Sequence, residues 1–492
     1  MSAAFSPSLQ LAGMDYIAPS AECIKPTMTT AGAATVTRHV AGAALPPEVL
    51  KITLQDCLAC SGCVTTAETI LITAQSREEI VRQREAHPRR PLVVSVSTQS
   101  AASLAAHYGL SHAAAYALVS GFVREVLAPP AGVPLYVTDL RWAQSVATRL
   151  TALEYRRRLR EAPHTLPLIV SACPGWVCYC EKQGGALLSH VCPVLSPQGI
   201  AGSYIKRGAL PDAYHVSVQP CFDRKLEAAR DSFTPGAPGA AAVPYTDCVV
   251  STAELLAWMQ ECIGPDAAGA PLTRWCAPLD SDLAPLLAGP AAPLALGLPA
   301  DIPEAHVRSS DGYHLAAMAM AAAAGGGPLD VQYAKGRNHN LLKATAPALP
   351  QQTFCVAYGF QQIQNIVRGL TKGLSAVKGY TFIELMACPG GCLNGGGQVR
   401  AQGGGDDALQ RLHACACDGS LPAEAAATAA TADSPPHSVR RVEDGAEALF
   451  RAATLARVLD RAAPELWSCT FHDRQKEFEE LLDKGNIHSL KW

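Results

Sequence analysis

The sequence lacks any long apolar segment and carries little net charge. No run reaches about 18 apolar residues, the length from which a transmembrane helix is expected, and the apolar stretch at residues 315–324 stops at three glycines. The 40 basic and 43 acidic residues are scattered and leave a net charge of −3. No basic block predicts a nucleic-acid groove or an anionic membrane surface, so we expect no nucleic-acid partner and no membrane partner.

The first residues of the sequence do not have the pattern of a secretory leader. The first 25 residues have no basic region ahead of their apolar residues, and Asp15 and Glu22 interrupt them. We therefore expect a cytoplasmic protein with a nuclear pool, in a reducing compartment. The 18 cysteines among 492 residues are then free, catalytic or metal-bound thiols and not a disulfide framework.

Short Val-rich runs alternate with helical stretches, and this alternation predicts an α/β fold with parallel or mixed sheets flanked by helices. Residues 101–127 and 142–159 have the pattern of helices, and Val249 begins a strand-to-helix step. The expected strands are residues 91–98, 133–138, 167–171, 215–218, 354–358 and 380–385. With 49% hydrophobic and 17% charged residues, the chain has a globular composition and room for two or three lobes.

Three segments rich in Ala, Gly, Pro and Asp interrupt this pattern, at residues 231–246, 263–305 and 402–438. Such compositions bury too little apolar surface to order the backbone, so we expect mobile insertions that carry no chemistry. After Cys469 the chain becomes charged and helical, and it then runs into a short polar tail that ends in Trp492.

The first cysteine group is the run Cys57, Cys60 and Cys63, with two residues between neighbours. Three thiolates at this spacing can point inward from one loop and hold three corners of an iron–sulfur cube. Cys23 is the only other cysteine before residue 172, so it is the natural fourth ligand. A structural zinc site is the alternative, although zinc usually takes paired Cys-x2-Cys motifs, and free thiols are a third reading.

The second cysteine group is spread over three loops that each follow an expected strand. Cys388 and Cys392 lie in the Gly-rich segment ELMACPGGCLNGGGQ, where glycines let the backbone approach a bulky inorganic group. Cys173 lies in SACPGWV and Cys221 in QPCFDRKLE. Because α/β folds place ligand sites past the carboxyl ends of their strands, these loops predict four converging thiolates.

These three segments resemble the signature loops of the FeFe hydrogenases, which read TSCCPGW, MPCxxKxxE and ExMACPGGCxxGGGQ. The segments SPQ at residues 196–198 and DCVVSTAE at residues 247–254 match as well. The residues DYI…CIKP around Cys23, together with Trp492, resemble more specifically the NARF-like cytosolic iron–sulfur assembly factors. The resemblance covers most of the chain outside the three insertions.

The resemblance implies two [4Fe–4S] clusters as cofactors. Cluster 1 would be held by Cys23, Cys57, Cys60 and Cys63. Cluster 2, at the hydrogenase active-site position, would be held by Cys173, Cys221, Cys388 and Cys392. The implied domains are an N-terminal cluster segment (residues 1–80), two hydrogenase-like lobes (88–246 and 247–450) and a helical tail like the hydrogenase small-subunit region (451–492).

Two positions depart from the hydrogenase pattern. Ala172 stands where the resemblance implies a proton-delivering cysteine, and a methyl group can neither donate nor accept a proton. Arg224 stands where the resemblance implies a lysine that meets a diatomic ligand, and the planar guanidinium is no simple replacement. Both changes leave the four thiolates of cluster 2 in place, so we predict a protein that is not an enzyme.

The predicted function is that of a non-catalytic component of cytosolic iron–sulfur protein assembly. It would help to pass clusters from an upstream scaffold to the targeting complex, which contains a WD-repeat propeller protein, and on to apo-proteins. The resemblance implies that the targeting complex binds Trp492, and packing of this ring on its own lobe is the alternative. An FeFe hydrogenase and a two-cluster electron carrier are the alternative functions.

The other cysteines and the lone histidines are expected to be structural. Cys178 and Cys180 follow the first loop closely, but half-buried thiols are common. Cys415 and Cys417 form a Cys-x-Cys pair in a low-complexity stretch, where a chance surface pair is expected. The cysteines expected in the core are Cys192, Cys248, Cys262, Cys276, Cys355 and Cys469. His190, His215 and His472 are expected to be structural and not metal ligands.

Overall fold

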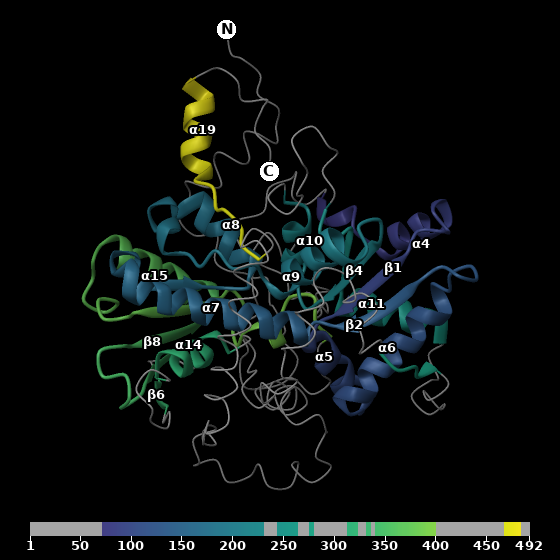
Figure 1. The fold of residues 1–492 in the computed structure, drawn as a ribbon, viewed down its shortest axis with the longest axis horizontal. Helices are drawn as coiled ribbons and strands as arrows, with labels where there is room; N and C mark the ends of the chain where they lie inside the picture. Colours follow the sequence, from purple (N-terminus) through teal and green to yellow (C-terminus); the bar gives the residue numbers. More distant parts are fainter. Residues whose placement is uncertain are drawn as a thin grey trace, which may run out of the picture.

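The computed structural model describes residues 71–230, 244–263, 275–279, 312–322, 331–335, 340–399 and 467–483. In this part of the chain two β-sheets lie side by side and helices flank them (Figure 1). Among the described helices, none combines the length and the hydropathy that crossing a bilayer requires. The predicted α/β architecture with parallel and mixed sheets is confirmed.

The first sheet is parallel and has the strand order β2-β1-β4-β5. Its strands are β1 (Leu92–Val96), β2 (Leu135–Asp139), β4 (Tyr214–Gln219) and β5 (Cys248–Ser251). Every residue of β1 and β4 is buried, as expected for parallel strands covered on both faces. The helices packed around this sheet are α4 (Arg77–Ala86), α5 (Thr98–Tyr108), α6 (His112–Val126) and α11 (Thr252–Ile263).

The second sheet is mixed and has the strand order β3-β9-β8-β7-β6. Its strands are β3 (Leu168–Val170), β6 (Gln332–Lys335), β7 (Leu341–Thr345), β8 (Phe354–Tyr358) and β9 (Phe382–Met386). The strands β3, β9 and β8 pair in parallel. The next two pairings, β8 with β7 and β7 with β6, are antiparallel and form one edge of the sheet. This edge hairpin was not predicted from the sequence. The helices against this sheet are α7 (Arg141–Glu161), α14 (Tyr313–Ala322) and α15 (Phe360–Thr371).

Shorter helices and turns complete the part of the fold that the structure describes. They are α8 (Pro174–Gln183), α9 (Pro197–Tyr204), α10 (Asp223–Ala228), α19 (Arg474–Asp483), the 3-10 turns η1 (Pro163–Thr165), η2 (Gly185–His190) and η8 (Cys392–Asn394), and the π-helical turn η3 (Ile205–Ala209). The charged helix predicted after Cys469 is α19, which packs on α8 and η2.

The two sheets interleave along the chain. β3 lies within the predicted first lobe but pairs with β9 in the second sheet, whereas β5 follows residue 247 but pairs with β4 in the first sheet. The predicted lobes, 88–246 and 247–450, therefore do not coincide with sheet membership. As a result, loops from both halves of the chain meet where the sheets adjoin.

The helical stretch predicted at residues 101–127 is confirmed as helical, but it is divided between two helices, α5 and α6. Gly109 ends α5 in the left-handed conformation with φ +66°, which glycine adopts without a steric penalty. Ser111 then begins α6, and its side-chain oxygen accepts a hydrogen bond from the backbone N–H of Ala114 at 3.2 Å. These two capping residues were present in the sequence but were read as part of one helical run.

One piece of the predicted insertion 263–305 is ordered against α6, which corrects the expectation of a mobile loop there. The backbone N–H of Ala277 donates to the carbonyl oxygen of Ala117 at 3.0 Å. A Cβ on Gly121 would lie 1.3 Å from the carbonyl oxygen of Trp275, so only glycine permits this contact. Most of the three insertions lies outside the described residues.

Candidate metal centre

Cys173 is positioned by the end of β3 and the start of α8. Its backbone N–H donates to the side-chain oxygen of Ser171 at 3.1 Å, and that hydroxyl donates to the carbonyl oxygen of Leu385 on β9. Pro174 then occupies the first turn of α8, where its missing N–H costs nothing. The Cys173 side chain is buried, and its loop is tied to the strand that leads into Cys388.

Cys221 follows β4 and is also buried. The third loop lies directly on it, since the backbone N–H of Gly397 donates to the carbonyl oxygen of Pro220 at 2.9 Å. A Cβ on Gly397 would lie 3.2 Å from the Cα of Cys221, and one on Gly395 would lie 2.3 Å from the carbonyl oxygen of Pro220. The glycines of this loop therefore allow the close backbone approach that the sequence predicted.

Cys388 and Cys392 follow β9 in a turn that two glycines make possible. Gly390 and Gly391 have φ values of +71° and +84°, which a side chain would strain. The backbone N–H of Gly391 donates to the carbonyl oxygen of Cys388 at 3.0 Å, which closes the turn. The Sγ atom of Cys392 lies 3.8 Å from the Sδ atom of Met386. Both cysteines are half-buried.

Cys173 and Cys388 lie within electrostatic reach of Cys221, and Cys392 lies within reach of a neighbour that it shares with Cys221. Burial raises the pKa of Cys221 well above its ordinary value, and the charges of Asp223, Cys388 and Cys173 raise it further. Cys392 is connected to the group because its charge acts, like that of Cys221, on the guanidinium of Arg224. The structure thus brings together the four cysteines that the sequence singled out, at the carboxyl ends of β3, β4 and β9.

This donor set suits a cluster of several metal atoms better than a single ion. Four sulfurs on one tetrahedral ion lie ~3.8 Å apart, given metal–sulfur bonds of ~2.3 Å. Within the described residues, no three His, Cys, Asp or Glu side chains are gathered closely enough to hold one ion. In an iron–sulfur cube each thiolate binds its own iron, so the thiolates stand farther apart. Four converging thiols beside a glycine-lined loop therefore fit such a group.

Three charged side chains beside the thiols were not assigned a role from the sequence, although all lie in the segment after Cys221. The carboxylate of Asp223 would lie 2.8 Å from a Cβ on Gly175, so it reaches across to the first loop. Arg224 forms an ion pair with Glu227, with 2.6 Å between Nη1 and Oε2. The sequence signal for these side chains was the charged run at residues 223–227, which begins two positions after Cys221.

A second buried network anchors the start of the described chain to α10. The Nζ atom of Lys225 donates to the carbonyl oxygen of Gln75 at 2.7 Å and pairs with Glu254 at 2.7 Å. The Gln75 side chain donates to the carbonyl oxygen of Lys225 at 2.8 Å and accepts from the backbone N–H of Val249 at 3.0 Å. Residues 71–76 are thus fixed beside the loop that carries Cys221.

Several predicted residues lie outside the described part of the chain. These are Cys23, Cys57, Cys60, Cys63, Cys415, Cys417 and Trp492. Their roles stay predictions. Ala172 is described, and its side chain is buried beside Cys173.

Most of the cysteines expected to be structural are indeed enclosed. Cys180, Cys192, Cys248 and Cys355 are buried, whereas Cys178 and Cys469 are half-buried. Cys262 and Cys276 correct the expectation, because both are exposed. Cys262 lies near the end of α11, facing away from the core, and Cys276 lies in the short ordered piece of the insertion. Among the histidines, His215 is fully buried, and His190 and His472 are half-buried with hydrogen-bond partners.

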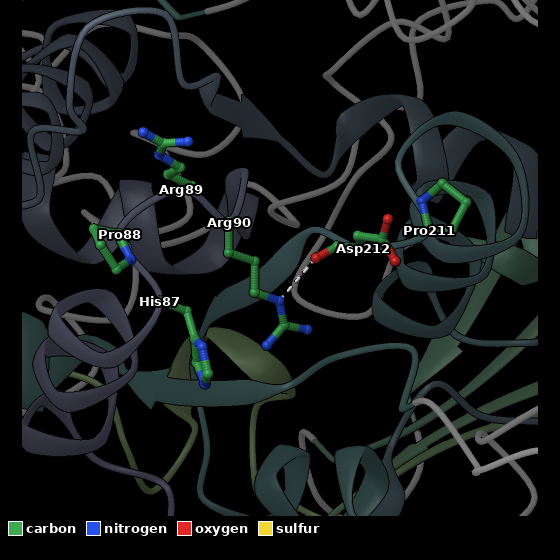
Figure 2. Close-up of a pocket in the computed structure, with 6 residues that line it drawn as sticks. All are labelled: His87, Pro88, Arg89, Arg90, Pro211 and Asp212. Carbon is green, nitrogen blue, oxygen red and sulfur yellow. Dashed lines mark hydrogen bonds between the residues drawn. The ribbon is translucent and has the colours of Figure 1, made fainter.

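A separate open hollow of about 610 Å³ lies at the other end of the first sheet (Figure 2). Its lining residues precede β1 and β4 and are His87, Pro88, Arg89, Arg90, Pro211 and Asp212. The Nε atom of Arg90 donates to the carbonyl oxygen of Asp212 at 2.8 Å, so this guanidinium joins two loops. The hollow therefore lies at the amino ends of the strands, away from the four cysteines.

Comparisons with known proteins agree with this architecture. Residues 90–396 match the family described as iron only hydrogenase large subunit, C-terminal domain. Cytosolic iron-sulfur assembly component 3 of Rattus norvegicus is 36% identical over 437 residues, which cover 82% of this chain and 86% of the relative. Protein NAR1 of Arabidopsis thaliana is 33% identical over 438 residues, with coverages of 82% and 86%. The solved structure of a variant of FeFe-hydrogenase HydA1 from Chlamydomonas reinhardtii matches with a TM-score of 0.57 at 20% identity, covering 80% of this chain and 98% of that one.

Proposed function

Because the chain belongs to the iron-only hydrogenase large-subunit family and, within it, to the cytosolic iron–sulfur assembly factors, we propose that it is a non-catalytic carrier of iron–sulfur clusters in cytosolic cluster assembly. The observation that carries this proposal is the convergence of four thiols from three loops at the junction of the two sheets. Those loops join strands from opposite halves of the chain, so a cluster held there would also brace the fold.

Cluster 2 would be a [4Fe–4S] cube held by Cys173, Cys221, Cys388 and Cys392. Such a cube supplies a one-electron redox centre and a covalent link between loops. The chain supplies the enclosure: burial of Cys173 and Cys221, and glycines at positions 395 and 397 that let the third loop approach the second. Burial of this kind slows exchange with solvent, so cluster 2 is proposed to be structural and retained.

Hydrogen turnover is not part of the proposed function. The residue before Cys173 is Ala172, whose buried methyl group offers no proton donor or acceptor at this position. An enzyme that moves protons needs a group within hydrogen-bond reach of the reacting atoms. Infrared bands of iron-bound CO and CN⁻ in the purified protein would contradict this part of the proposal.

Cluster 1 is proposed in the N-terminal segment, on Cys23, Cys57, Cys60 and Cys63. The described chain begins eight residues after Cys63, so this cysteine lies within about 29 Å of Leu71 at full extension. Residues 71–76 are fixed on α10 by Gln75 and Lys225. The described chain that follows this segment is therefore fixed beside the loop of Cys221. We propose that cluster 1 is the labile one that is passed on.

The proposed partners are an upstream cytosolic scaffold and the targeting complex that loads apo-proteins. What supports them is the name of the rat relative, which gives that protein a role in cytosolic iron–sulfur assembly. A cytoplasmic location, with a nuclear pool, is part of the same proposal. Docking of Trp492 to the targeting complex remains a prediction.

Chelator challenge of two variants tests the division of roles. A full-length chain with Cys57→Ala, Cys60→Ala and Cys63→Ala should retain only cluster 2, and Cys388→Ala should retain only cluster 1. Under anaerobic conditions the Cys388→Ala protein should lose its remaining iron to an external chelator at least tenfold faster than the triple variant. Equal rates, or faster loss from the triple variant, would contradict a labile N-terminal cluster.

A further inference from the structure

Arg224 is a buried charge in the wall of the proposed cluster 2 site. It lies in α10, three residues after Cys221, and its side chain is only 6% exposed. Its Nη1 atom donates to the Oε2 atom of Glu227 at 2.6 Å, and the Glu227 side chain is only 7% exposed. Burying a guanidinium is costly unless the charge is compensated, so its other interactions matter.

The orientation of Arg224 is fixed from α9. The second carboxylate oxygen of Glu227 accepts a hydrogen bond from the hydroxyl of Ser196, which also accepts from the backbone N–H of Gly199 at 3.1 Å and so begins α9. The side chain of Gln198 donates to the carbonyl oxygen of Arg224 at 3.1 Å. The guanidinium therefore has a preset position, which two segments far apart in the sequence define.

The charge of Arg224 acts on three of the four proposed ligands. Burial alone would lower its pKa, but the negative charges of Glu227, Cys221 and Cys392 outweigh burial and raise it. In turn, the guanidinium lowers the pKa of Cys221 and of Cys173, against the larger raising effects of burial and of Asp223. Glu227 pairs with Arg224, and the same guanidinium lies within electrostatic reach of Cys221 and Cys392.

We propose that Arg224, held by Glu227 and Ser196, is a positioning residue that compensates the negative charge of cluster 2 and sets its reduction potential. This inference rests on the proposed function, because it requires that the four cysteines hold an iron–sulfur cube. A cube with four thiolates is anionic, and one-electron reduction adds a further negative charge without a proton. A fixed positive charge in a buried site favours the reduced form, so it makes the potential less negative.

Lys225 is the matched control for this role. It lies in the same helix and is also buried, but its Nζ atom binds Gln75 and Glu254, and its charge acts on Cys248. Replacing either residue removes one buried charge from α10. Only Arg224 should affect the cluster.

The test compares Arg224→Gln, Arg224→Lys and Lys225→Gln in the full chain that carries Cys57→Ala, Cys60→Ala and Cys63→Ala, so that cluster 2 alone is observed. Iron and sulfide are counted, and an anaerobic potentiometric titration is followed by EPR. At a fixed potential, Arg224→Gln should lower the ratio of reduced to oxidised cluster by about tenfold, a shift of about −59 mV for a one-electron couple. Arg224→Lys should restore most of that ratio, and Lys225→Gln should leave it unchanged.

The outcomes separate this inference from the proposed function. Absence of iron from the parent chain would overturn the proposed function itself. Iron with an unchanged potential in Arg224→Gln would overturn only the role of Arg224, as would a shift of the same size in Lys225→Gln. Iron lost from Arg224→Gln but kept in Arg224→Lys would support the need for positive charge, whereas iron lost from both variants would contradict it.

Discussion

At the scale of single residues, the thiols at the junction of the sheets differ from the other buried thiols by their surroundings. Cys355 lies inside β8, where burial raises its pKa to about 12, and it has no second thiol among its described interactions. Cys388 lies in a Gly-rich turn and acts electrostatically on Cys221. The same residue type thus has a packing role in one place and a proposed ligand role in the other.

This contrast makes a paired prediction for Cys388→Ala and Cys355→Ala. The first removes one of four thiolates, so the protein should lose most of the iron of cluster 2, and its melting temperature should fall because the link between the three loops is lost. The second should keep its iron and lose only a small packing term. Metal analysis and thermal unfolding of anaerobic protein measure both, and full iron content in Cys388→Ala would place the site elsewhere.

A second prediction at this scale concerns Gly397. A Cβ there would lie 2.7 Å from the Cβ of Ser251 and 3.2 Å from the Cα of Cys221, so the backbone would have to shift. Gly397→Ala should therefore lower the free energy of unfolding by about 1–3 kcal/mol and reduce iron retention. Gly379, around which nothing lies within 4 Å of the added Cβ, is the control. Gly379→Ala should stay within about 0.5 kcal/mol of the parent in urea unfolding, and equal losses in both variants would remove the steric argument.

At the scale of secondary-structure elements, α10 contacts both the proposed cluster 2 site and residues 71–76, which follow the proposed cluster 1 segment. Its residues Arg224 and Lys225 are neighbours in sequence but interact with different groups. Arg224 lies within electrostatic reach of Cys221 and Cys392, and Lys225 donates to the carbonyl oxygen of Gln75. A helix of six residues with two buried cations is stable here because each cation has its own carboxylate. The attachment of the N-terminal segment therefore depends on this helix.

Gln75 tests that attachment. Gln75→Ala removes the acceptor of the Val249 N–H and one donor to the Lys225 carbonyl, which keeps its bond from the N–H of Ala229. One buried group left without this partner costs about 1–3 kcal/mol. Hydrogen exchange should show faster opening of residues 71–76 and of the start of β5. Gln83, whose side chain bonds only to Glu79 on the outer part of α4, is the control. If Gln83→Ala speeds exchange of residues 71–76 as much, the proposed anchor is not specific.

The strands were predictable from the sequence, whereas several junctions were not. Short runs rich in β-branched or aromatic residues placed β1, β4 and β9 within two residues, because such side chains pack well in buried parallel strands. The break between α5 and α6 was missed because Gly109 and Ser111 act locally within an apolar stretch. The β6–β7 edge was missed because its short strands alternate weakly and are only half-buried.

At the scale of the whole molecule, stability should depend on pH through His215. This ring is fully buried between the hydroxyl of Ser95, 2.9 Å from Nε2, and the carbonyl oxygen of Tyr245, 2.8 Å from Nδ1. Burial, aided by the charge of Lys206, lowers its pKa to about 4 from 6.5. Between these two values the unfolded chain binds a proton that the folded chain does not, so stability is full above pH ~6.5 and falls as the pH drops toward 4.

The expected loss from this one group is about 3 kcal/mol across that window. His215→Gln should be less stable at pH 7 but should show a flatter dependence between pH 6.5 and 4. The exposed His87 is the control, and His87→Gln should keep the slope of the parent. Urea unfolding at a series of pH values measures this, and an unchanged slope in His215→Gln would contradict a neutral buried ring.

The candidate site was predictable in part for a physical reason. The four thiols lie in short motifs with glycine or proline beside them, so each could be recognised from its own neighbours in the sequence. The charges that complete the site depend on partners far away, such as Ser196 for Glu227 and Gln75 for Lys225, and only the folded chain brings these together. The pairing of β3 with β9 and of β5 with β4 could not be predicted for the same reason.

The most direct measurement is of iron and acid-labile sulfide, with Mössbauer spectra, in anaerobic full-length protein carrying Cys57→Ala, Cys60→Ala and Cys63→Ala. We expect equal amounts of iron and sulfide and the spectrum of one four-iron cube, which should disappear when Cys221→Ala is added. Zinc in place of iron, no metal at all, or a cube that survives the loss of Cys221 would contradict this expectation.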